Sequence, residues 1–272
     1  MKYEQSIGEA SIRMMDNDSK IGVLATQDQN GYPHLTFISS IQATGPNQLT
    51  WGQFSAGESK KFILERPDVG FLALDATYQY LRGLARYTHN ETTGPEYELY
   101  NKKPLFRYNC YLSFARIYYM DLVGVTPLAK LNMGQIVAGA LLSRVKALFQ
   151  RADKRSALPY TGCKLFSELT SLKFLCYFEA EGRPCIIPII QACSAGSDRI
   201  VYAGMPFGDE LSAVPDGAKA AILCLNLNME SVLVKGRAHK GLLDIERVYN
   251  SMPPKMGYVY PRSERMETVR EF

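Results

Sequence analysis

Apolar residues in this chain fall mostly into short runs separated by polar turns, a pattern typical of antiparallel β-structure. A polar turn ending in Gly31 and a Gly-Pro-Asn turn at residues 45–47 divide the first part of the chain. The sequence predicts a strand for each apolar run between residues 21 and 75, namely IGVLAT, HLTFISSIQ, QLTWGQ and VGFLALD. Residues 60–65 are predicted to form a helical turn before the last of these strands.

The flanking segments complete this first β domain and lead into a helix. A short helix is predicted within residues 1–20, and a long strand over residues 111–125. Between them we predict a strand over residues 78–87, bent at its glycine, and a loop or short helix over residues 88–104. Apolar side chains at a period of 3.6 then predict a helix within residues 128–150, at Ile136, Val137, Ala140, Leu141, Val145, Leu148 and Phe149.

The chain repeats its own pattern at an offset of 151 residues. Gly182 follows Gly31 by 182 − 31 = 151 residues, and Pro184 follows Pro33 by the same number. The segments around these residues align without a gap, and FLALD at 71–75 falls opposite ILCLN at 222–226. Because turn residues recur in register with apolar runs, the sequence predicts two related β domains.

The two copies differ in one short polar loop. Residues 59–61, Ser-Lys-Lys, fall opposite residues 210–212, Glu-Leu-Ser. Backbone N–H groups, hydroxyls and ammonium groups can converge on one phosphate, so the loop at residues 55–61 is a candidate anion site. Solvated lysines at a helix start are the alternative. The second loop lacks both cations and is predicted to be degenerate as a phosphate site.

Composition and charge narrow the class of protein. The chain has 272 residues and a net charge of +4, which is too small an excess to indicate nucleic-acid binding. No apolar run approaches the ~18 residues of a membrane helix, and the N-terminal segment lacks the apolar core of a signal peptide, so we expect a cytoplasmic protein without a membrane partner. The six cysteines form no CxxC pair and are interpreted as small core residues.

In their order along the chain, these motifs resemble the pyridoxamine 5′-phosphate oxidase-like, FMN-binding split-barrel superfamily. The resemblance rests on IGVLAT, NGYPHLTFISS, QLTWGQ and the Ser-Lys-Lys loop before ERPDVGFLALD. It implies a mainly β fold with peripheral helices, in which two tandem split β-barrel domains are related by the internal repeat. The expected divisions are an FMN-binding domain at 1–127, a connecting helix and linker at 128–162, and a second, degenerate barrel at 163–272.

The resemblance also implies a cofactor, FMN, and a site for it. In the superfamily a Ser-Arg/Lys-Lys motif holds the FMN phosphate, and the preceding strand lies along the isoalloxazine ring. Thr36 stands where the superfamily's oxidase has an arginine, which removes one bidentate phosphate contact. The residues carried over by position are Thr36, Phe37, Ile38, Ser39, Gln53, Ser59, Lys60 and Lys61.

The expected function is that of a flavoprotein oxidoreductase that transfers hydride or electrons to or from a small molecule, with a nicotinamide as one candidate donor. The alternative is a non-catalytic split-barrel protein that binds flavin, haem or another ligand. No catalytic constellation and no metal site are predicted, because His34, His89 and His239 are isolated. We expect the flavin at an interface, either between the two copies in one chain or in a homodimer.

Tyrosines are concentrated in one part of the chain. Nine of the 17 tyrosines fall between residues 78 and 119, which favours packing or a dimer contact, with a wall against the flavin as the alternative. Arg107 in the same region is a candidate for orienting an anionic substrate, with a surface salt bridge as the alternative. The basic segment from residue 144 to 155 is interpreted as a solvated helix end, with a contact to an acidic partner or to nucleic acid as the alternative.

Overall fold

The computed structural model of the protein describes residues 2–53, 57–103, 114–150, 155–228, 230–250, 255–261 and 267–268. They belong to two units of the chain. The first unit contains Thr36–Leu131 together with the chain up to Thr26, and the second contains Gln27–Leu35 and Asn132–Thr268.

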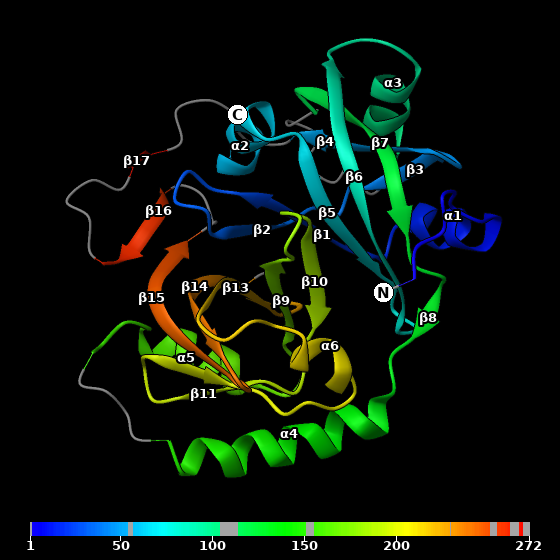
Figure 1. The fold of residues 1–272 in the computed structure, drawn as a ribbon. Helices are drawn as coiled ribbons and strands as arrows, with labels where there is room; N and C mark the ends of the chain where they lie inside the picture. The colour runs from blue at the N-terminus through cyan, green and yellow to red at the C-terminus, as the bar shows by residue number, and fades with distance from the viewer. Residues whose placement is uncertain are drawn as a thin grey trace. The chain divides into compact units, whose positions relative to one another are not determined.

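One antiparallel sheet forms the centre of the first unit (Figure 1). Its strands lie in the order β2-β1-β5-β6-β7-β4-β3, and β8 pairs with β6. The elements are α1 (Glu9–Asp16), β1 (Ile21–Gln27), β2 (Pro33–Phe37), β3 (Gln42–Gly45), β4 (Gln48–Gln53), α2 (Glu58–Glu65), β5 (Asp68–Leu74), β6 (Gln79–Glu91), α3 (Pro95–Lys102), β7 (Arg116–Val125) and β8 (Ala129–Lys130).

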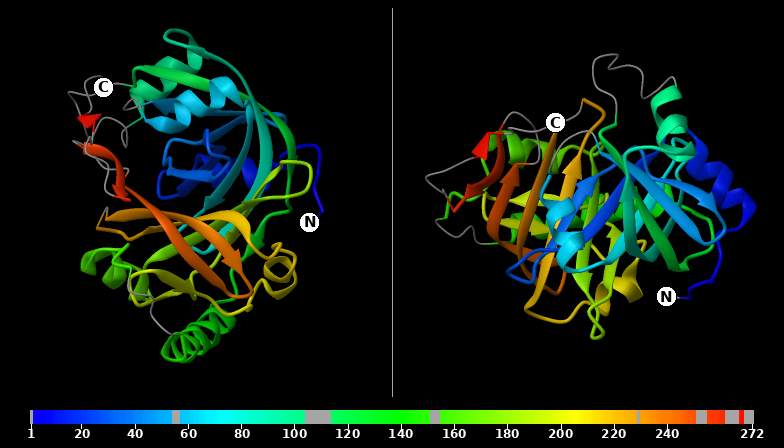
Figure 2. Two further views of the ribbon diagram at one scale, coloured as in Figure 1. Left: turned by 60° about the vertical axis from the view of Figure 1, so that its left-hand side comes forward. Right: turned by 90° about the horizontal axis from the view of Figure 1, so that it is seen from above.

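A second antiparallel sheet forms the centre of the second unit, and α4 lies at the periphery of that unit (Figures 1 and 2). The strand order is β10-β9-β13-β14-β15-β12-β11, with β16 beside β15 and β17 beside β16. The elements are α4 (Met133–Leu148), α5 (Tyr160–Ser167), β9 (Leu172–Phe178), β10 (Pro184–Pro188), β11 (Cys193–Ala195), β12 (Arg199–Val201), α6 (Gly208–Ser212), β13 (Ala218–Leu225), β14 (Ser231–His239), β15 (Leu242–Asn250), β16 (Lys255–Tyr260) and β17 (Glu267–Thr268).

The two sheets share both strand order and register. Matching β1 to β9 and each later strand to its counterpart makes the two orders identical. Leu24 faces Phe71 in the first sheet, and Leu175 faces Ile222 in the second, each residue 151 positions after its counterpart. The predicted fold class, mainly β with peripheral helices in two domains of one topology, is therefore confirmed. The predicted boundaries at residues 127 and 162 remain a prediction.

Tight turns explain why glycine recurs at the 151-residue offset. Gly31 and Gly182 have φ angles of 77° and 75°, in the left-handed region that favours glycine. The N–H of each donates to a carbonyl three residues earlier, from Gly31 to Asp28 at 3.0 Å and from Gly182 to Glu179 at 2.8 Å. Both hairpins therefore need the same residue for the same steric reason.

Each unit has its own apolar core. Leu24, Trp51 and Phe71 are buried in the first, and Phe166 and Leu175 in the second. Full burial of such side chains contributes about 1.5–3 kcal/mol each before the loss of conformational entropy is subtracted. Helices α1 and α2, where a short helix and a helical turn were predicted, add to the first core through Met14 and Met15 and through Ile63.

One predicted strand was wrong. The run HLTFISSIQ forms two strands, because β2 ends at Phe37 and β3 begins at Gln42. Between them the N–H of Ile38 donates to the carbonyl of Gly22 at 2.8 Å, and Ile38 and Ile41 are both buried. The turn between the two strands is packed into the core, so its residues are as apolar as those of a strand. The pattern of apolar residues therefore gave no sign of the break between β2 and β3.

One further strand differs from the prediction in extent, and the structure gives the bounds of the helix predicted within residues 128–150. Strand β6 continues to Glu91, beyond the predicted end at residue 87. The sequence did not reveal this extension, because its residues are polar and mostly exposed and give no apolar signal. One of its two register shifts against β7 lies between Leu84 and Ala85, next to the bend predicted at Gly83. Helix α4 begins only at Met133, where the side chain of Asn132 accepts a hydrogen bond from the N–H of Gln135 at 3.1 Å.

A glycine at a register shift gives a test of the fold. β14 and β15 shift register between Lys235 and Gly236, and a Cβ on Gly236 would lie 1.8 Å from the backbone oxygen of Asp244. We expect Gly236→Ala to lower the free energy of unfolding by about 3 kcal/mol, because backbone must move. Gly208→Ala, which meets nothing within 4 Å, is the matched control in urea unfolding. Equal stability of the two variants would contradict the register.

Candidate functional site

The structure brings two of the predicted site residues into direct contact. The hydroxyls of Thr36 on β2 and Ser59 on α2 share a short hydrogen bond. Phe37 ends β2, whereas Ile38 and Ser39 lie in the turn beyond it. The prediction that one strand presents residues 36–39 is therefore wrong for Ile38 and Ser39, because the chain turns into the core there.

The start of α2 offers backbone donors beside this hydroxyl pair. Gly57 is the N-cap residue and supplies no side-chain hydrogen bond to the helix. The first N–H groups of a helix have no partner within the helix, and the positive end of the helix dipole favours an anion. Ser59 is buried in this first turn, and the N–H of Lys60 donates to the carbonyl of Gly57 at 3.2 Å.

Lys60 is a partly buried cation against an aromatic ring. Its Nζ lies 5.9 Å from the centroid of the Trp51 ring, a cation–π distance. Burial lowers the pKa of Lys60 to about 8. No carboxylate forms an ion pair with Lys60 among the residues that the structure describes. Holding an ammonium group in such a place costs free energy that an anion would offset.

Lys61 has a different environment from its neighbour. Its Nζ lies 3.0 Å from Oε1 of Glu58, and 62% of its side chain is exposed. An exposed pair of this kind contributes little to stability and is screened by salt. The two lysines that the sequence treated as one motif are therefore distinct, and Lys60 is the stronger candidate for contacting an anion.

Gln53 is joined to Lys60 through a stack of aromatic rings. Trp51 and Tyr118 lie face to face, with ring centroids 4.2 Å apart and planes 7° from parallel. The Tyr118 hydroxyl donates to Oε1 of Gln53 at 2.8 Å, which fixes the amide at the end of β4. Nε1 of Trp51 is buried and has no hydrogen-bond partner in the described part of the chain. The site therefore combines a cation with an indole N–H for which the described residues provide no acceptor.

Some of the tyrosines between residues 78 and 119 pack in the cores of the first unit, and others lie outside the described residues. Tyr100 and Tyr119 pack around Phe114 in a small cluster, and Tyr100 is held by Thr50 through a hydrogen bond of 2.9 Å. Tyr118 lies in the Trp51 stack of the main core. Packing thus accounts for these three. Arg107, Tyr108 and Tyr111, like Ser55 of the candidate loop, lie outside the described residues.

The second unit places an apolar residue where the first has its cation. Leu211 follows Lys60 by 151 positions, lies on the short helix α6, and belongs to the core of its unit. Tyr202, the counterpart of Trp51, is also buried. At this position the second unit therefore has a side chain suited to a core rather than to a phosphate.

A buried charge cluster in the second unit was not predicted. Nζ of Lys235 on β14 donates to Oδ2 of Asp28 at 2.7 Å and to the Tyr258 hydroxyl at 3.0 Å, with both charged side chains almost fully buried. Oδ1 of Asp28 accepts from the N–H groups of Asn30 and Tyr32, both at 2.9 Å. This dense bonding identifies the pair as a structural tie between the β1–β2 turn and β14. A lysine inside the apolar run SVLVKG was its one sequence signal.

The histidines have structural surroundings. Burial lowers the pKa of His34 well below its usual value, so the ring is neutral, and it meets Tyr249 edge-on at 4.8 Å. His89 stacks on Tyr119, and His239 lies 2.9 Å from Asp216. Within the described ranges, no group of three His, Cys, Asp or Glu side chains is placed to hold a metal ion.

Five of the cysteines are described, none of them in a disulfide, and four are buried, as small core residues would be. Cys110 lies outside the described residues. No helix in the described part of the chain has both the length and the apolar character needed to cross a membrane.

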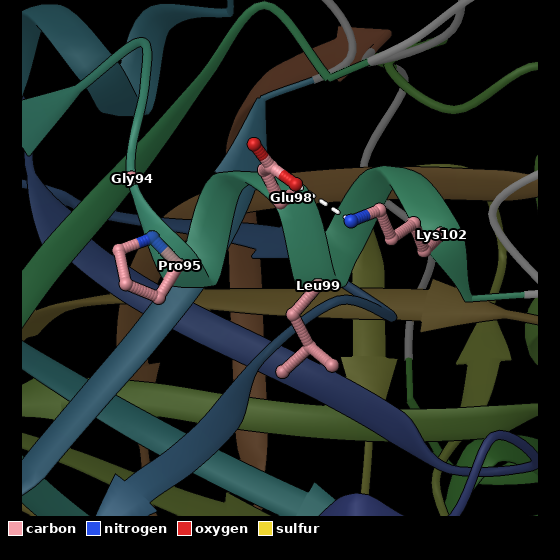
Figure 3. Close-up of a pocket in the computed structure, with 5 residues that line it drawn as sticks. All are labelled: Gly94, Pro95, Glu98, Leu99 and Lys102. Carbon is pink, nitrogen blue, oxygen red and sulfur yellow. Dashed lines mark hydrogen bonds and ion pairs between the residues drawn. The ribbon is translucent and has the colours of Figure 1, made fainter.

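A surface hollow of about 600 Å³ lies elsewhere in the first unit, on α3 (Figure 3). It is lined by Gly94, Pro95, Glu98, Leu99 and Lys102, with Lys102 and Glu98 joined at 2.6 Å. Its walls come from one helix and the N-cap of that helix, and none of the predicted site residues contributes. The candidate site therefore remains the start of α2.

The burial of Lys60 predicts a gain in stability when its charge is removed. The pKa of Lys60 is lower in the folded state, so its penalty is complete below pH 8 and disappears as the pH rises towards 10.5. We expect Lys60→Met to stabilise the flavin-free protein by about 1–3 kcal/mol at pH 7, and by much less at pH 10. Thermal unfolding of this variant and of Lys61→Met, which should change little, tests the point. A loss of stability at pH 7 would contradict it.

Comparison with known proteins gives likenesses of fold over less than half of the chain. No protein-family model matches the chain, and no curated protein matches it. Solved structures that do match include a candidate pyridoxamine 5′-phosphate oxidase of Lactobacillus delbrueckii, at 19% identity, 47% of this chain, 100% of that chain and a TM-score of 0.37. HupZ of Group A Streptococcus matches at 14% identity over 46% of this chain and 99% of that chain, with a TM-score of 0.37. An FMN-binding protein of Syntrophomonas wolfei matches at 17% identity over 45% of this chain and 84% of that chain, with a TM-score of 0.36.

Proposed function

We propose that the first unit binds FMN, with its phosphate at the start of α2, and that the chain is an FMN-dependent oxidoreductase acting on a small molecule. One observation carries the proposal. The ammonium of Lys60 is partly buried against Trp51, has no acidic partner among the described residues, and lies one residue from the Ser59–Thr36 hydroxyl pair.

These residues suit a phosphate monoester. Its dianion would offset the buried charge of Lys60, and its oxygens would accept from the Ser59 hydroxyl and from N–H groups at the start of α2. Thr36 would hold the Ser59 hydroxyl in place through their hydrogen bond. When bound, FMN supplies the hydride and electron chemistry that side chains lack.

The aromatic stack would provide a rigid wall beside this phosphate site. Trp51 and Tyr118 are buried in the core, so their positions are fixed by packing rather than by a ligand. Gln53 is held by Tyr118 at the end of β4, where its amide could position a polar group of the ligand. Preorganised donors of this kind lower the entropy cost of binding.

Replacing each lysine separately tests the assignment of the phosphate site. We expect Lys60→Ala to raise the Kd for FMN at least about tenfold, because a charge-assisted contact in a partly buried site is lost. Lys61→Ala should raise it less than about threefold, since Lys61 is exposed and paired with Glu58. Quenching of flavin fluorescence measures both. Equal effects, or no FMN binding by the wild type, would contradict the assignment.

The pH dependence of FMN binding should follow the charge of Lys60. Below pH 8 the ammonium is charged and binding is at its strongest, and above pH 8 the free protein loses this charge. We expect the Kd to rise roughly tenfold between pH 7 and pH 9. Lys60→Arg should remove this dependence while keeping affinity, because a guanidinium stays charged. An unchanged pH profile in Lys60→Arg would show that another group titrates.

A flavin-binding protein without turnover is the second candidate function. The described side chains at the start of α2 include no carboxylate or imidazole that could act as general acid or base, apart from Glu58, which pairs with Lys61. Anaerobic addition of NADH or NADPH to the FMN-loaded protein separates the two. Loss of the oxidised flavin absorbance, followed by reoxidation by an acceptor, supports the oxidoreductase, and flavin that no donor reduces supports the second candidate.

A further inference from the structure

Helix α4 has two apolar faces, and only one of them is covered by its own unit. The inner face packs on β11 and β12 through Ile136, Gly139, Ala140 and Ser143. The Ser143 hydroxyl donates to the carbonyl of Gly139 at 2.9 Å and accepts from the N–H of Ala203 at 2.8 Å, which fixes the rotation of the helix. The opposite face is therefore held outward.

The outward face is apolar along the whole helix. Its side chains are exposed by between 37% and 83%, and they are Met133, Val137, Leu141, Leu142, Val145, Leu148 and Phe149. These are mostly the residues whose 3.6-residue period suggested an ordinary amphipathic helix, but the structure buries only Ile136 and Ala140 of that set. A helix that is apolar on both faces is normally buried on both.

The spacing on this face suits a second helix. Ala138, Leu141, Val145 and Leu148 follow one another at intervals of three, four and three residues, and Ala138 is also exposed. This is the seam by which helices pack in coiled coils and bundles, with leucine and smaller apolar residues alternating. Such a seam indicates a helical partner rather than an extended peptide.

The exposed area is close to what a stable dimer requires. Summed over these seven residues, the exposed fractions correspond to on the order of 700 Å² of exposed surface per copy. A standard protein interface buries about 800 Å² on each partner, and the largest apolar patch of a typical monomer is about 300–600 Å². The outward face could therefore supply most of an interface by itself.

Charges on α4 define the edge of this face and its pairing direction. Arg144 and Lys146 are the charged residues of the helix, and they lie on opposite sides of the apolar stripe near its C-terminal end. Arg144 donates to the carbonyl of Ser167 at 3.2 Å. A parallel pair would bring the cations of two helices together, whereas an antiparallel pair separates them and aligns opposite ends of the helix dipoles.

We propose that the outward face of α4 binds the same face of a second copy of this chain, in an antiparallel, twofold-symmetric helix pair centred near Leu141. The interface is isologous, so each exposed leucine meets the partner's stripe and the cations lie at its rim. The proposal is independent of the proposed function, because no residue of the candidate flavin site takes part.

Sedimentation or light scattering of the full chain tests the pair. We expect the wild type to have twice the chain mass of 30.5 kDa at micromolar concentration. Leu141→Glu should weaken the dimer at least about thirtyfold, because it places two carboxylates at the centre of the interface, and Leu148→Glu should act in the same direction. Leu227→Glu alters an equally exposed leucine away from α4 and should leave the dimer intact.

The other outcomes would overturn the proposal. A wild-type monomer, or a dimer that survives both glutamate variants while their circular dichroism and FMN affinity are unchanged, would rule out this face as the contact. A monomer that sediments with anionic phospholipid vesicles through the same leucines would assign the face to a lipid surface instead.

Cross-linking tests the direction of the helices. Leu141→Cys should give a disulfide-linked dimer under mild oxidation, with the wild type as the control for the native cysteines. Met133→Cys lies about 12 Å from the centre along the helix, so it should not cross-link to itself in an antiparallel pair. Cross-linking through Met133→Cys but not Leu141→Cys would overturn the antiparallel arrangement.

Discussion

Strand pairing in a fixed register is the constraint on which both units depend. The residues that face each other across β1 and β5 recur across β9 and β13 at an offset of 151 in each strand. A slip of one residue would turn every core side chain towards the opposite face. Turn glycines such as Gly31 and Gly182 hold this register at the hairpins. The two sheets therefore have the same backbone arrangement, and they differ in the side chains at particular positions.

The difference is concentrated at one position. Leu211 completes a core in the second unit, whereas Lys60 places a charge against Trp51 in the first. The scaffold does not require that charge, since the counterpart segment of the second unit still forms a helix, the shorter α6, without it. A destabilising side chain in an otherwise consistent fold is most simply explained by a ligand that needs it. On this account Lys60 lowers the stability of the first unit and allows it to bind an anion, whereas Leu211 only contributes to the core of the second unit.

The sequence predicted what repeats and missed what depends on surroundings. Turn glycines and apolar runs revealed the two related domains, and the family resemblance placed Thr36 near Ser59, which the structure brings together. It could not separate Lys60 from Lys61, because the partner of Lys61 depends on side-chain position. It predicted the helix α4 but not which of its apolar side chains are covered, since a 3.6-residue period is the same whether a face packs on its own sheet or is left exposed, as at Leu141.

The number of flavins bound per chain tests this asymmetry most directly. Purified protein saturated with FMN, freed of excess ligand and then denatured would release its flavin for quantification against protein concentration. We predict one FMN per chain, because only the first unit places a lysine at the start of the helix that follows its fourth strand. Two FMN molecules per chain, or none under saturating conditions, would contradict the account.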